Sequence, residues 1–354
     1  MAAFLTGRGH AVEVVTTAAS RPERRAYPVR WVSRGIPVGV RHLATAALIG
    51  RRAAARDVVY TTGMFGRSAA GSSLVRRPYV LKLTADPAHE RARRRGLTAA
   101  DVERFQAERG DAWVRALRVA RDLELRRAAR VLCPSAYLRG LAIGWGIAPD
   151  RVEVLPNPVP RVARGSREEA RRRFGVDGPT VAFAGRLTAQ KALDVALEAL
   201  ARTDGVSLLL AGDGPERTAL AARSSELGLD GRVRFLGAQS REAVLELFRA
   251  ADAAILSSSW ENFPHTVVEA LAVGTPVIAT ATGGVAEVVE DGRNGLLSPP
   301  GDPAALAAAL GRYFGDESLR ERLRSAAAPS VEAYAPERIY TRLEEILLAA
   351  ARSG

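Results

Sequence analysis

The sequence predicts two doubly wound α/β domains in tandem, and three observations lead to this fold class. Its 354 residues fit two domains of ordinary size. Short apolar runs alternate with helix-like stretches in both halves, as in parallel sheets covered by helices on both faces. A Pro-, Gly- and Arg-rich segment, Pro156 to Ser166, separates the halves like a linker. Ligands bind beyond the carboxyl ends of such strands, so a cleft between the domains is the expected site.

The first domain is predicted to cover residues 1–160. Residues 2–7 are expected to end a helix, because Gly7 and Gly9 are stop signals. A long helical stretch covers 98–130 with a break near Gly110, and a C-terminal helix at 336–354 is expected to pack back on this domain. The predicted strands are Ala11–Val15, Val29–Val32, Val58–Tyr60, Tyr79–Leu83, Val131–Leu132 and Val152–Leu155.

The second domain is predicted to cover residues 161–335, with strands and helices in regular alternation. The strands are recognised as short apolar runs and the helices as longer amphipathic stretches. The expected strands are Thr180–Ala184, Val206–Leu210, Val233–Leu236, Ala253–Leu256 and Pro276–Ala279, and the helices include Ala192–Leu200, Pro215–Leu227, Arg241–Ala250 and Pro264–Ala272.

Charge is divided unequally along the chain. The net charge is +12, but residues 1–175 hold 34 Lys and Arg against 15 Asp and Glu, whereas residues 176–354 hold 17 against 24. The basic half suggests an anionic partner, either acidic membrane lipid or nucleic acid. The alternative is compositional, with arginines on solvated helix faces of an Arg- and Ala-rich chain.

The sequence shows no signal peptide and no apolar run long enough to span a membrane. Its one cysteine, Cys133, fits a reducing compartment. The expected address is therefore the cytoplasm, with peripheral attachment to the inner face of the plasma membrane as the refinement that the basic half suggests.

The strongest chemical signal is the run from Trp260 to Leu271, which follows a predicted strand. Pro264 suits the first helical position and Asn262 can cap the helix before it. Glu261 then lies in the loop and Glu269 within the helix, on either side of an N-terminal anion site. Two carboxylates around an anion site fit a ligand with hydroxyls at both ends and phosphates between, such as a nucleotide sugar. Alternatively, both glutamates are ordinary surface residues.

A second signal follows the strand that ends at Ala184. Gly185 allows a ligand to approach the backbone, and Arg186 and Lys191 can hold a diphosphate without a metal. The alternative is a solvated Arg–Lys pair beside a tight turn.

Two glycine-rich turns follow other strands. The pair Gly283 and Gly284 permits close approach of a substrate or forms a plain turn. The segment 211–215 (Ala-Gly-Asp-Gly-Pro) is interpreted as a strand-to-helix turn, because it lacks the spacing of the dinucleotide fingerprint.

These residues together resemble glycosyltransferase family 4 (group 1), the retaining glycosyltransferases of the two-domain GT-B type. The family's Glu, seven residues, Glu motif is matched by Glu261 and Glu269, and its donor-diphosphate Arg and Lys by Arg186 and Lys191. The resemblance runs from about residue 151 to 348 and is weaker in the first half, where it rests on 9–12, 134–135 and 155–157. It implies two Rossmann-like domains facing a cleft.

The resemblance also implies roles for individual residues. Glu261 would contact sugar hydroxyls as a catalytic residue, and Glu269 would contact the ribose. The donor would be a UDP- or GDP-sugar, with no cofactor and, since no Asp-x-Asp spacing is present, no divalent metal. The remaining donor-binding residues implied are Leu236 and Gly237 at the base, Asn262, Phe263, Pro264, His265 and Thr266 at the sugar and phosphate, and Gly185, Gly283 and Gly284.

In the first half, Asp86 and His89 are the candidates for orienting an acceptor or stabilising charge. The segment 84–91 resembles a Gly-Asp-x-Ala-Trp-Glu run of some family members, with alanine for glycine and histidine for tryptophan. The alternative is that Asp86 caps the next helix and His89 is exposed. His10 and His42 are interpreted as structural.

Three departures from the family pattern stand out. Ala192 and Pro158 occupy positions where the family often has glycine. The chain also begins where the family's first long helix ends, so we expect this start to be internal to a longer native protein that supplies a central first strand.

The predicted function is transfer of a sugar, with retention, from a nucleoside-diphosphate sugar to a lipid-linked or saccharide acceptor, in cell-surface polysaccharide or glycolipid synthesis. The rivals are a nucleotide-sugar epimerase and a non-catalytic or truncated sugar-nucleotide-binding protein. A nucleic-acid partner is not expected, because few aromatic residues accompany the arginines.

Overall fold

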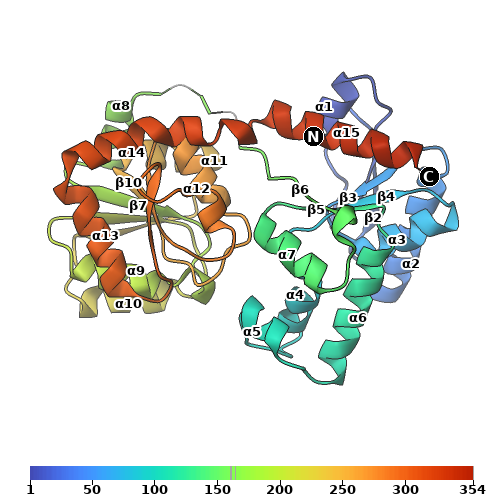
Figure 1. The fold of residues 1–354 in the computed structure, drawn as a ribbon, viewed down its shortest axis with the longest axis horizontal. Coiled ribbons are helices and arrows are strands. Elements are labelled where there is room, and N and C mark those ends of the chain that lie inside the picture. The colour runs from blue at the N-terminus through green and yellow to red at the C-terminus, as the bar shows by residue number, and fades with distance from the viewer. Residues whose placement is uncertain (160–161, 164, 354) are drawn as a thin grey trace. The chain divides into compact units, whose positions relative to one another are not determined.

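The computed structural model describes residues 1–159, 162–163 and 165–353 and divides the chain into two compact units (Figure 1). Unit 1 comprises Met1–Pro156 and Glu337–Gly354, and unit 2 comprises Asn157–Pro336. The predicted boundary between 160 and 161 lies outside the described residues. Within the described chain, no helix is both long enough and apolar enough to cross a membrane.

Unit 2 is built on a sheet of six parallel strands in the order β12-β11-β10-β7-β8-β9. The chain builds outward from β7 through β8 and β9, then returns to the centre at β10 and builds the other way. The point between β7 and β10 is therefore a topological switch point, beyond whose carboxyl ends ligands bind in such sheets. The strands are β7 (Thr180–Ala184), β8 (Ser207–Ala211), β9 (Val233–Gly237), β10 (Ala253–Leu256), β11 (Val277–Thr280) and β12 (Gly295–Ser298).

Helices cover both faces of this sheet and bury one continuous apolar core. The central strands β7, β10 and β11 are buried along their whole length, as expected for strands covered on both faces. Strand β12 and helices α8, α13 and α14 are additions to the elements predicted from sequence. The helices are α8 (Arg167–Phe174), α9 (Leu193–Ala201), α10 (Arg217–Glu226), α11 (Arg241–Ala250), α12 (His265–Ala272), α13 (Pro303–Gly315) and α14 (Glu317–Ser330), with short turns η2 (Ala189–Lys191), η3 (Val285–Glu287) and η4 (Glu332–Tyr334).

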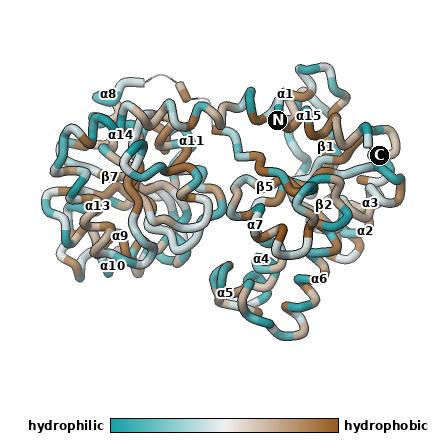
Figure 2. The backbone as a smooth tube through the Cα atoms, viewed as in Figure 1, coloured by the Kyte–Doolittle hydropathy of each residue, from teal (hydrophilic) through white to brown (hydrophobic). Residues whose placement is uncertain are grey.

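Unit 1 contains a four-stranded parallel sheet, β3-β4-β5-β6, and a separate parallel pair, β1-β2. The strand expected at 11–15 has the wrong bounds, because the structure places it at Val14–Ala18. It starts later because the His10 amide still bonds to the carbonyl of Leu5 at the end of the preceding helix, and it ends later because the β-branched Thr16 and Thr17 extend it. In Figure 2 the apolar colour runs through β5, as it does through β7 of unit 2. The strands are β1 (Val14–Ala18), β2 (Val29–Ser33), β3 (Val59–Thr61), β4 (Tyr79–Lys82), β5 (Arg130–Cys133) and β6 (Val152–Val154).

The C-terminal helix α15 (Pro336–Arg352) packs on unit 1. Its buried residues Ile339, Leu343 and Ile346 share one apolar cluster with Val80 and Leu132 of the sheet. The long helical stretch breaks before Asp111, where Gly110 has a φ of 68°. The remaining helices of unit 1 are α1 (Ala2–Gly7), α2 (Val38–Ala53), α3 (Phe65–Leu74), α4 (Pro87–Arg94), α5 (Val102–Ala107), α6 (Ala112–Arg126), α7 (Ala136–Gly144) and the turn η1 (Pro149–Arg151).

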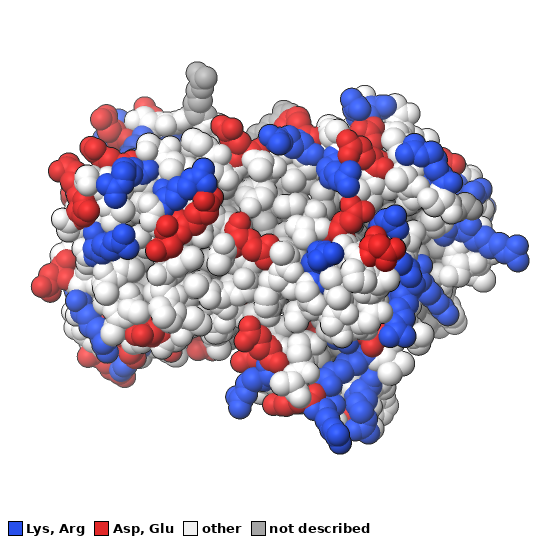
Figure 3. All heavy atoms as spheres, in the orientation of Figure 1, with Lys and Arg blue, Asp and Glu red and all other residues white. Residues whose placement is uncertain are grey.

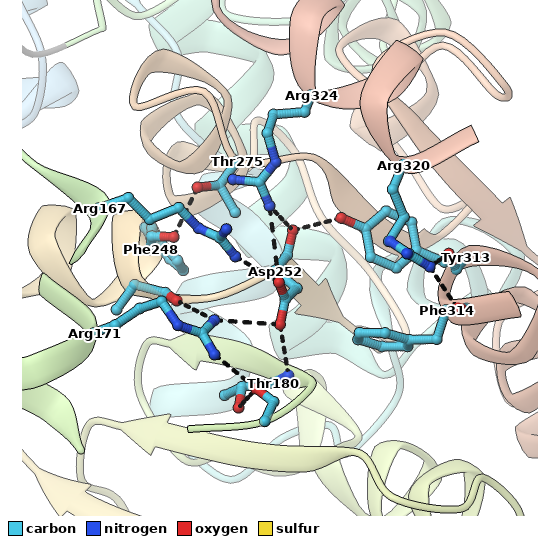
Figure 4. A network of polar contacts seen from close by, with 12 residues as sticks. Arg167, Arg171, Thr180, Phe248, Asp252, Thr275, Tyr313, Phe314, Arg320 and Arg324 are labelled. Carbon is cyan, nitrogen blue, oxygen red and sulfur yellow. Dashed lines mark hydrogen bonds and ion pairs between the residues drawn. The ribbon is translucent and has the colours of Figure 1, made fainter. Parts of the chain in front are cut away.

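An aspartate at the amino edge of the unit 2 sheet joins three helices to two strands through its side chain and its backbone carbonyl (Figure 4). Asp252, just before β10, accepts a hydrogen bond from the Thr180 amide at the start of β7 at 2.8 Å. Its oxygens also lie 2.5 Å from Arg167, 3.6 Å from Arg171 and 3.9 Å from Arg324. The backbone carbonyl of Asp252 accepts the Tyr313 hydroxyl at 2.6 Å. One side chain therefore neutralises guanidinium groups from α8 and α14.

Replacing Asp252 with Asn should destabilise the protein by about 2 kcal/mol, because three partly buried arginines would lose their counter-charge. Urea unfolding followed by circular dichroism measures this loss. Glu290→Gln is the matched control, since Glu290 pairs with Arg293 on the open surface and should contribute less than about 0.5 kcal/mol. Equal midpoints for the two variants would contradict the role given to Asp252.

Lys82 is a buried cation at the end of β4. Its ammonium donates to the carbonyl of Leu155. Burial lowers the pKa of Lys82 from 10.5 to about 8, and the neighbouring Cys133 partly opposes that shift. Burial also raises the pKa of the Cys133 thiol from 9.0 to about 12. The folded protein releases the Lys82 proton at a lower pH than the unfolded chain does. The charge on Lys82 therefore lowers the free energy of unfolding.

The sign of this effect predicts that stability rises with pH just above neutrality. Below about pH 8 Lys82 is charged in both states, and above it the unfolded chain holds a proton that the folded state has lost. Beyond about pH 9 the Cys133 thiol acts in the opposite sense. Urea unfolding of the wild type should therefore show up to about 1 kcal/mol more stability at about pH 9 than at about pH 8. Lys82→Met should flatten that rise, and an unchanged slope in the variant would disprove it.

Candidate functional site

Loops at the carboxyl ends of β7, β8 and β9 are joined by main-chain hydrogen bonds. The Gly185 amide donates to the carbonyl of Ala211 at 2.9 Å, and the Gly212 amide donates to that of Gly237 at 2.7 Å. The Leu187 amide donates to the Asp213 carbonyl at 3.0 Å. These bonds continue the sheet pairing past the strand ends and hold the loop backbones in fixed positions.

Glycine is required where these loops touch. A Cβ on Gly212, whose φ is 145°, would lie 1.8 Å from the carbonyl oxygen of Gly185. A Cβ on Gly283, whose φ is 50°, would lie 1.8 Å from the carbonyl oxygen of Glu261. The Gly284 amide donates to that same oxygen at 2.9 Å. Gly283 therefore lies in a turn, as one of the two alternatives predicted, and its missing side chain makes room for the backbone of the Glu261 loop.

A pocket of about 320 Å³ opens at this edge, wholly within unit 2. It lies between the ends of β7 and β8 on one side and helices α11 and α12 on the other. Of the residues predicted from sequence, Gly185, Arg186, Thr266 and Glu269 line it. The other lining residues are Ala184, Ala211, Gly212, Asp213, Ala238, Gln239, Arg241 and Val244.

Glu269 is a buried carboxylate held by an arginine in the pocket. The Nε and Nη2 atoms of Arg241 both donate to Oε1 of Glu269, at 3.1 and 3.0 Å. Among the described residues, no hydrogen bond to Oε2 of Glu269 is recorded. This leaves one oriented acceptor oxygen, which suits a ligand hydroxyl.

Positive charge in the pocket comes from Arg186 and from the start of α12. Arg186 is exposed at the pocket wall and forms no salt bridge within the part of the chain that the structure describes. Helix α12 begins at His265, not at Pro264, so Pro264 occupies the N-cap position and not the first helical position; a cap by Asn262 stays a prediction. The cause of the later start is the backbone of Pro264, whose ψ of 89° is not helical. Thr266 in this first turn faces the pocket, where the amino end of a helix favours an anion.

Lys191 and Glu261 form an ion pair at the switch point of the sheet. Lys191 follows β7, Glu261 follows β10, and Nζ lies 2.5 Å from Oε1. The Ser258 hydroxyl donates to the same oxygen at 2.7 Å. Lys191 is thus bound to Glu261, and neither residue lines the pocket that contains Arg186 and Glu269. The next residue, Ala192, has a φ of 43°, a left-handed conformation that favours glycine.

The other residues predicted to bind the sugar donor are not among the residues that line the pocket. The carbonyls of Leu236 and Gly237 accept hydrogen bonds from Gln239 and Gly212, so the pocket wall at this strand end is formed by the next two residues, 238 and 239. Phe263 is buried with its ring 5.7 Å from that of Tyr334. Asn262 is also buried, and Nε2 of His265 lies 3.1 Å from Nδ2 of Asn157.

Asp86 and His89 are both buried in unit 1. Asp86 caps α4 through the Ala88 amide at 2.8 Å and accepts bonds from Gln106 at 2.9 Å and Arg121 at 3.1 Å. The alternative of an exposed His89 is wrong, because its Nε2 lies 2.9 Å from the carbonyl of Ala100 and its ring packs on Phe105. Their assignment to a reacting centre stays a prediction.

Sequence reasoning missed Arg241, Gln239 and Asp213. Arg241 was placed at the start of a helix, and its partner Glu269 lies 28 residues further along the chain. Their pairing depends on α11 and α12 packing together. For Asp213 a signal existed, namely its place in a glycine turn directly after β8.

The fold defines a protein with two Rossmann-like units of GT-B type, and the second unit contains the pocket that Arg186 and Glu269 line. Residues 166–329 match the family described as Glycosyl transferases group 1, and residues 1–161 match Glycosyltransferase Family 4. The chain belongs to the group 1 glycosyltransferases.

Two relatives illustrate the sequence likeness. The chain is 40% identical over 147 residues to the lipopolysaccharide core biosynthesis glycosyltransferase LpsE of Rhizobium meliloti (strain 1021), covering 42% of this chain and 43% of the relative. It is 32% identical over 250 residues to the D-inositol 3-phosphate glycosyltransferase of Acidothermus cellulolyticus, covering 65% of this chain and 56% of the relative. The matches therefore span only about half the length of these relatives.

The fold is shared with a solved structure, that of Anabaena Alr3699/HepE in complex with UDP-glucose. The TM-score is 0.77 at 22% identity, over 95% of this chain and 99% of that one.

Proposed function

We propose that the protein is a retaining glycosyltransferase that moves a sugar from a nucleoside-diphosphate sugar to an acceptor hydroxyl. The observation that carries this proposal is the pocket at the carboxyl edge of unit 2. There the oriented carboxylate of Glu269 and the side chain of Arg186, which has no salt bridge to any described residue, face one cavity. Family membership and the UDP-glucose held by the HepE structure support it.

The donor would lie along the carboxyl edge of the sheet. The free oxygen of Glu269 accepts a ribose hydroxyl, and Arg186 and the start of α12 bind the diphosphate. Glu261, on the β10 side of the switch point, accepts the hydroxyls of the sugar. The bond between the anomeric carbon and the diphosphate oxygen breaks, and the acceptor oxygen bonds to that carbon on the same face. The acceptor hydroxyl gives its proton to the departing diphosphate oxygen. Arg186, Lys191 and the helix end stabilise the charge of the leaving diphosphate without a divalent metal or cofactor.

Lys191 has two partners available in this scheme. Its ammonium pairs with Glu261, and a bound diphosphate would offer the same ammonium a second anion. Sharing Lys191 between the carboxylate and the diphosphate would leave Glu261 freer to bind sugar hydroxyls once the donor is present.

The acceptor is proposed to be lipid-linked or a saccharide, with the protein attached peripherally to the inner face of the plasma membrane. Unit 1 carries 31 Lys and Arg against 16 Asp and Glu, a net charge of +15, whereas unit 2 carries 20 against 23, a net charge of −3. A basic unit suits an anionic surface. The lipopolysaccharide function in the name of LpsE supports a place in cell-surface polysaccharide or glycolipid synthesis.

Glu261→Ala should abolish transfer, with turnover falling by at least about a hundredfold, because the sugar loses the acceptor that orients it. The assay is release of UDP or GDP from a panel of nucleotide sugars, with unfolding midpoints recorded alongside. Glu290→Ala, on the open surface, should retain full turnover. Wild-type turnover in the Glu261 variant would remove its role, and nucleotide binding without any turnover in the wild type would make the protein a non-catalytic binder.

Arg241→Gln should weaken binding of UDP or GDP about threefold to tenfold, because Glu269 loses the two bonds that orient it. Isothermal titration measures the affinity. Arg312→Gln, an exposed arginine on α13, is the control and should bind like the wild type. An unchanged affinity in the Arg241 variant would mean that this ion pair does not shape the site.

A further inference from the structure

Helix α6 of unit 1 has two apolar faces. Its inward face packs Val114, Leu117 and Leu125 into the unit. Its outward face should be polar in a helix that meets only water, but the residues opposite the packed side include a second set of apolar side chains.

The outward apolar residues recur at helical spacing. Trp113 has 66% of its surface exposed, Val119 58% and Leu123 55%. Ala116 is exposed between them. Residues three, four and seven apart lie on one side of a helix, so these side chains form a continuous stripe along α6. We call Trp113, Ala116, Val119 and Leu123 the α6 stripe.

Exposed arginines border one edge of the α6 stripe and its C-terminal end. Arg115, Arg126 and Arg127 are exposed at helical positions next to it. The two acids of the helix lie near the edges of the stripe but are partly buried and paired, Asp122 with Arg121 at 2.9 Å and Glu124 with Arg91 at 2.8 Å. In Figure 3, Lys and Arg side chains gather along the side of unit 1 that carries α3 and α6.

We propose that the α6 stripe and its flanking arginines dock unit 1 on an anionic lipid bilayer. Tryptophan and aliphatic side chains enter the boundary between headgroups and acyl chains, and arginines bind the lipid phosphates. The proposal deepens the proposed function, because it rests on an acceptor held at a membrane and names the surface that would meet that membrane.

The observations favour lipid over the other occupants of such a face. A two-fold pair of chains with antiparallel α6 helices would place the arginine edge of one stripe against that of the other, where like charges repel. A nucleic acid would be read by stacking on aromatic rings, whereas Val119 and Leu123 are aliphatic. A bilayer satisfies both the apolar stripe and its positive border.

Vesicle co-sedimentation tests the proposal with the whole protein. The vesicles contain phosphatidylcholine alone or with about 30% phosphatidylglycerol, at about 0.05 M and about 0.5 M salt. The wild type should bind the anionic vesicles at low salt, and Leu123→Asp should lower the bound fraction about tenfold. Leu348→Asp is the matched control, since Leu348 is a 41% exposed leucine on α15, and it should bind like the wild type.

Two further readouts separate docking from folding and from the proposed reaction. Trp113 emission should shift to shorter wavelength on anionic vesicles, and Trp113→Phe should remove that shift while binding persists. UDP or GDP binding should be equal in the wild type and Leu123→Asp, so a failure of transferase activity leaves the docking result intact. Equal vesicle binding by the wild type and Leu123→Asp, or sedimentation of the wild type as a dimer that Leu123→Asp dissociates, would overturn the proposal.

Discussion

Main-chain contact between loops at the carboxyl edge of the unit 2 sheet is the constraint on which the site depends. Gly212 lies against the carbonyl of Gly185, and Gly283 lies against the carbonyl of Glu261, at separations that no side chain permits. The loops are therefore positioned by backbone, which moves less than side chains do. Arg186 and Glu261 belong to these loops, so the positions of their backbones are fixed. A site that binds charged groups needs its charged side chains held in this way.

Charged groups at the two edges of the unit 2 sheet differ in how fully they are bonded within the protein. At the amino edge, Asp252 is fully committed to arginines and to the Thr180 amide, so its charge stabilises the fold. At the carboxyl edge, Glu269 is bonded through one oxygen, and Arg186 is without a salt bridge among the described residues. Hydrogen-bonding atoms that have no partner in the protein and face a cavity can bind a ligand. Unit 1 carries the excess positive charge of the chain.

Much of the fold could be predicted from sequence, because periodicity reports which faces of an element are buried. The strand from Thr180 to Ala184 and the helix from Arg241 to Ala250 were predicted with the bounds that the structure has. The predicted bounds differ from the structure where adjacent residues determine the start of an element. The first strand of unit 1 starts later than predicted, because hydrogen bonds at the end of α1 reach as far as His10. Helix α12 starts one residue later than predicted, because the backbone of Pro264 is not helical.

The sequence by itself determined the order of strands and helices, the uneven charge and the set of residues near the carboxyl edge, because these follow from local pattern and from parallel-strand topology. Tertiary structure alone decided the partners within that set. Lys191 pairs with Glu261 across the switch point, Arg241 reaches Glu269 from another helix, and Asp86 is occupied by Arg121. Spacing along a chain places side chains on an element, but ion pairs form across elements, and only packing brings those within a few ångströms.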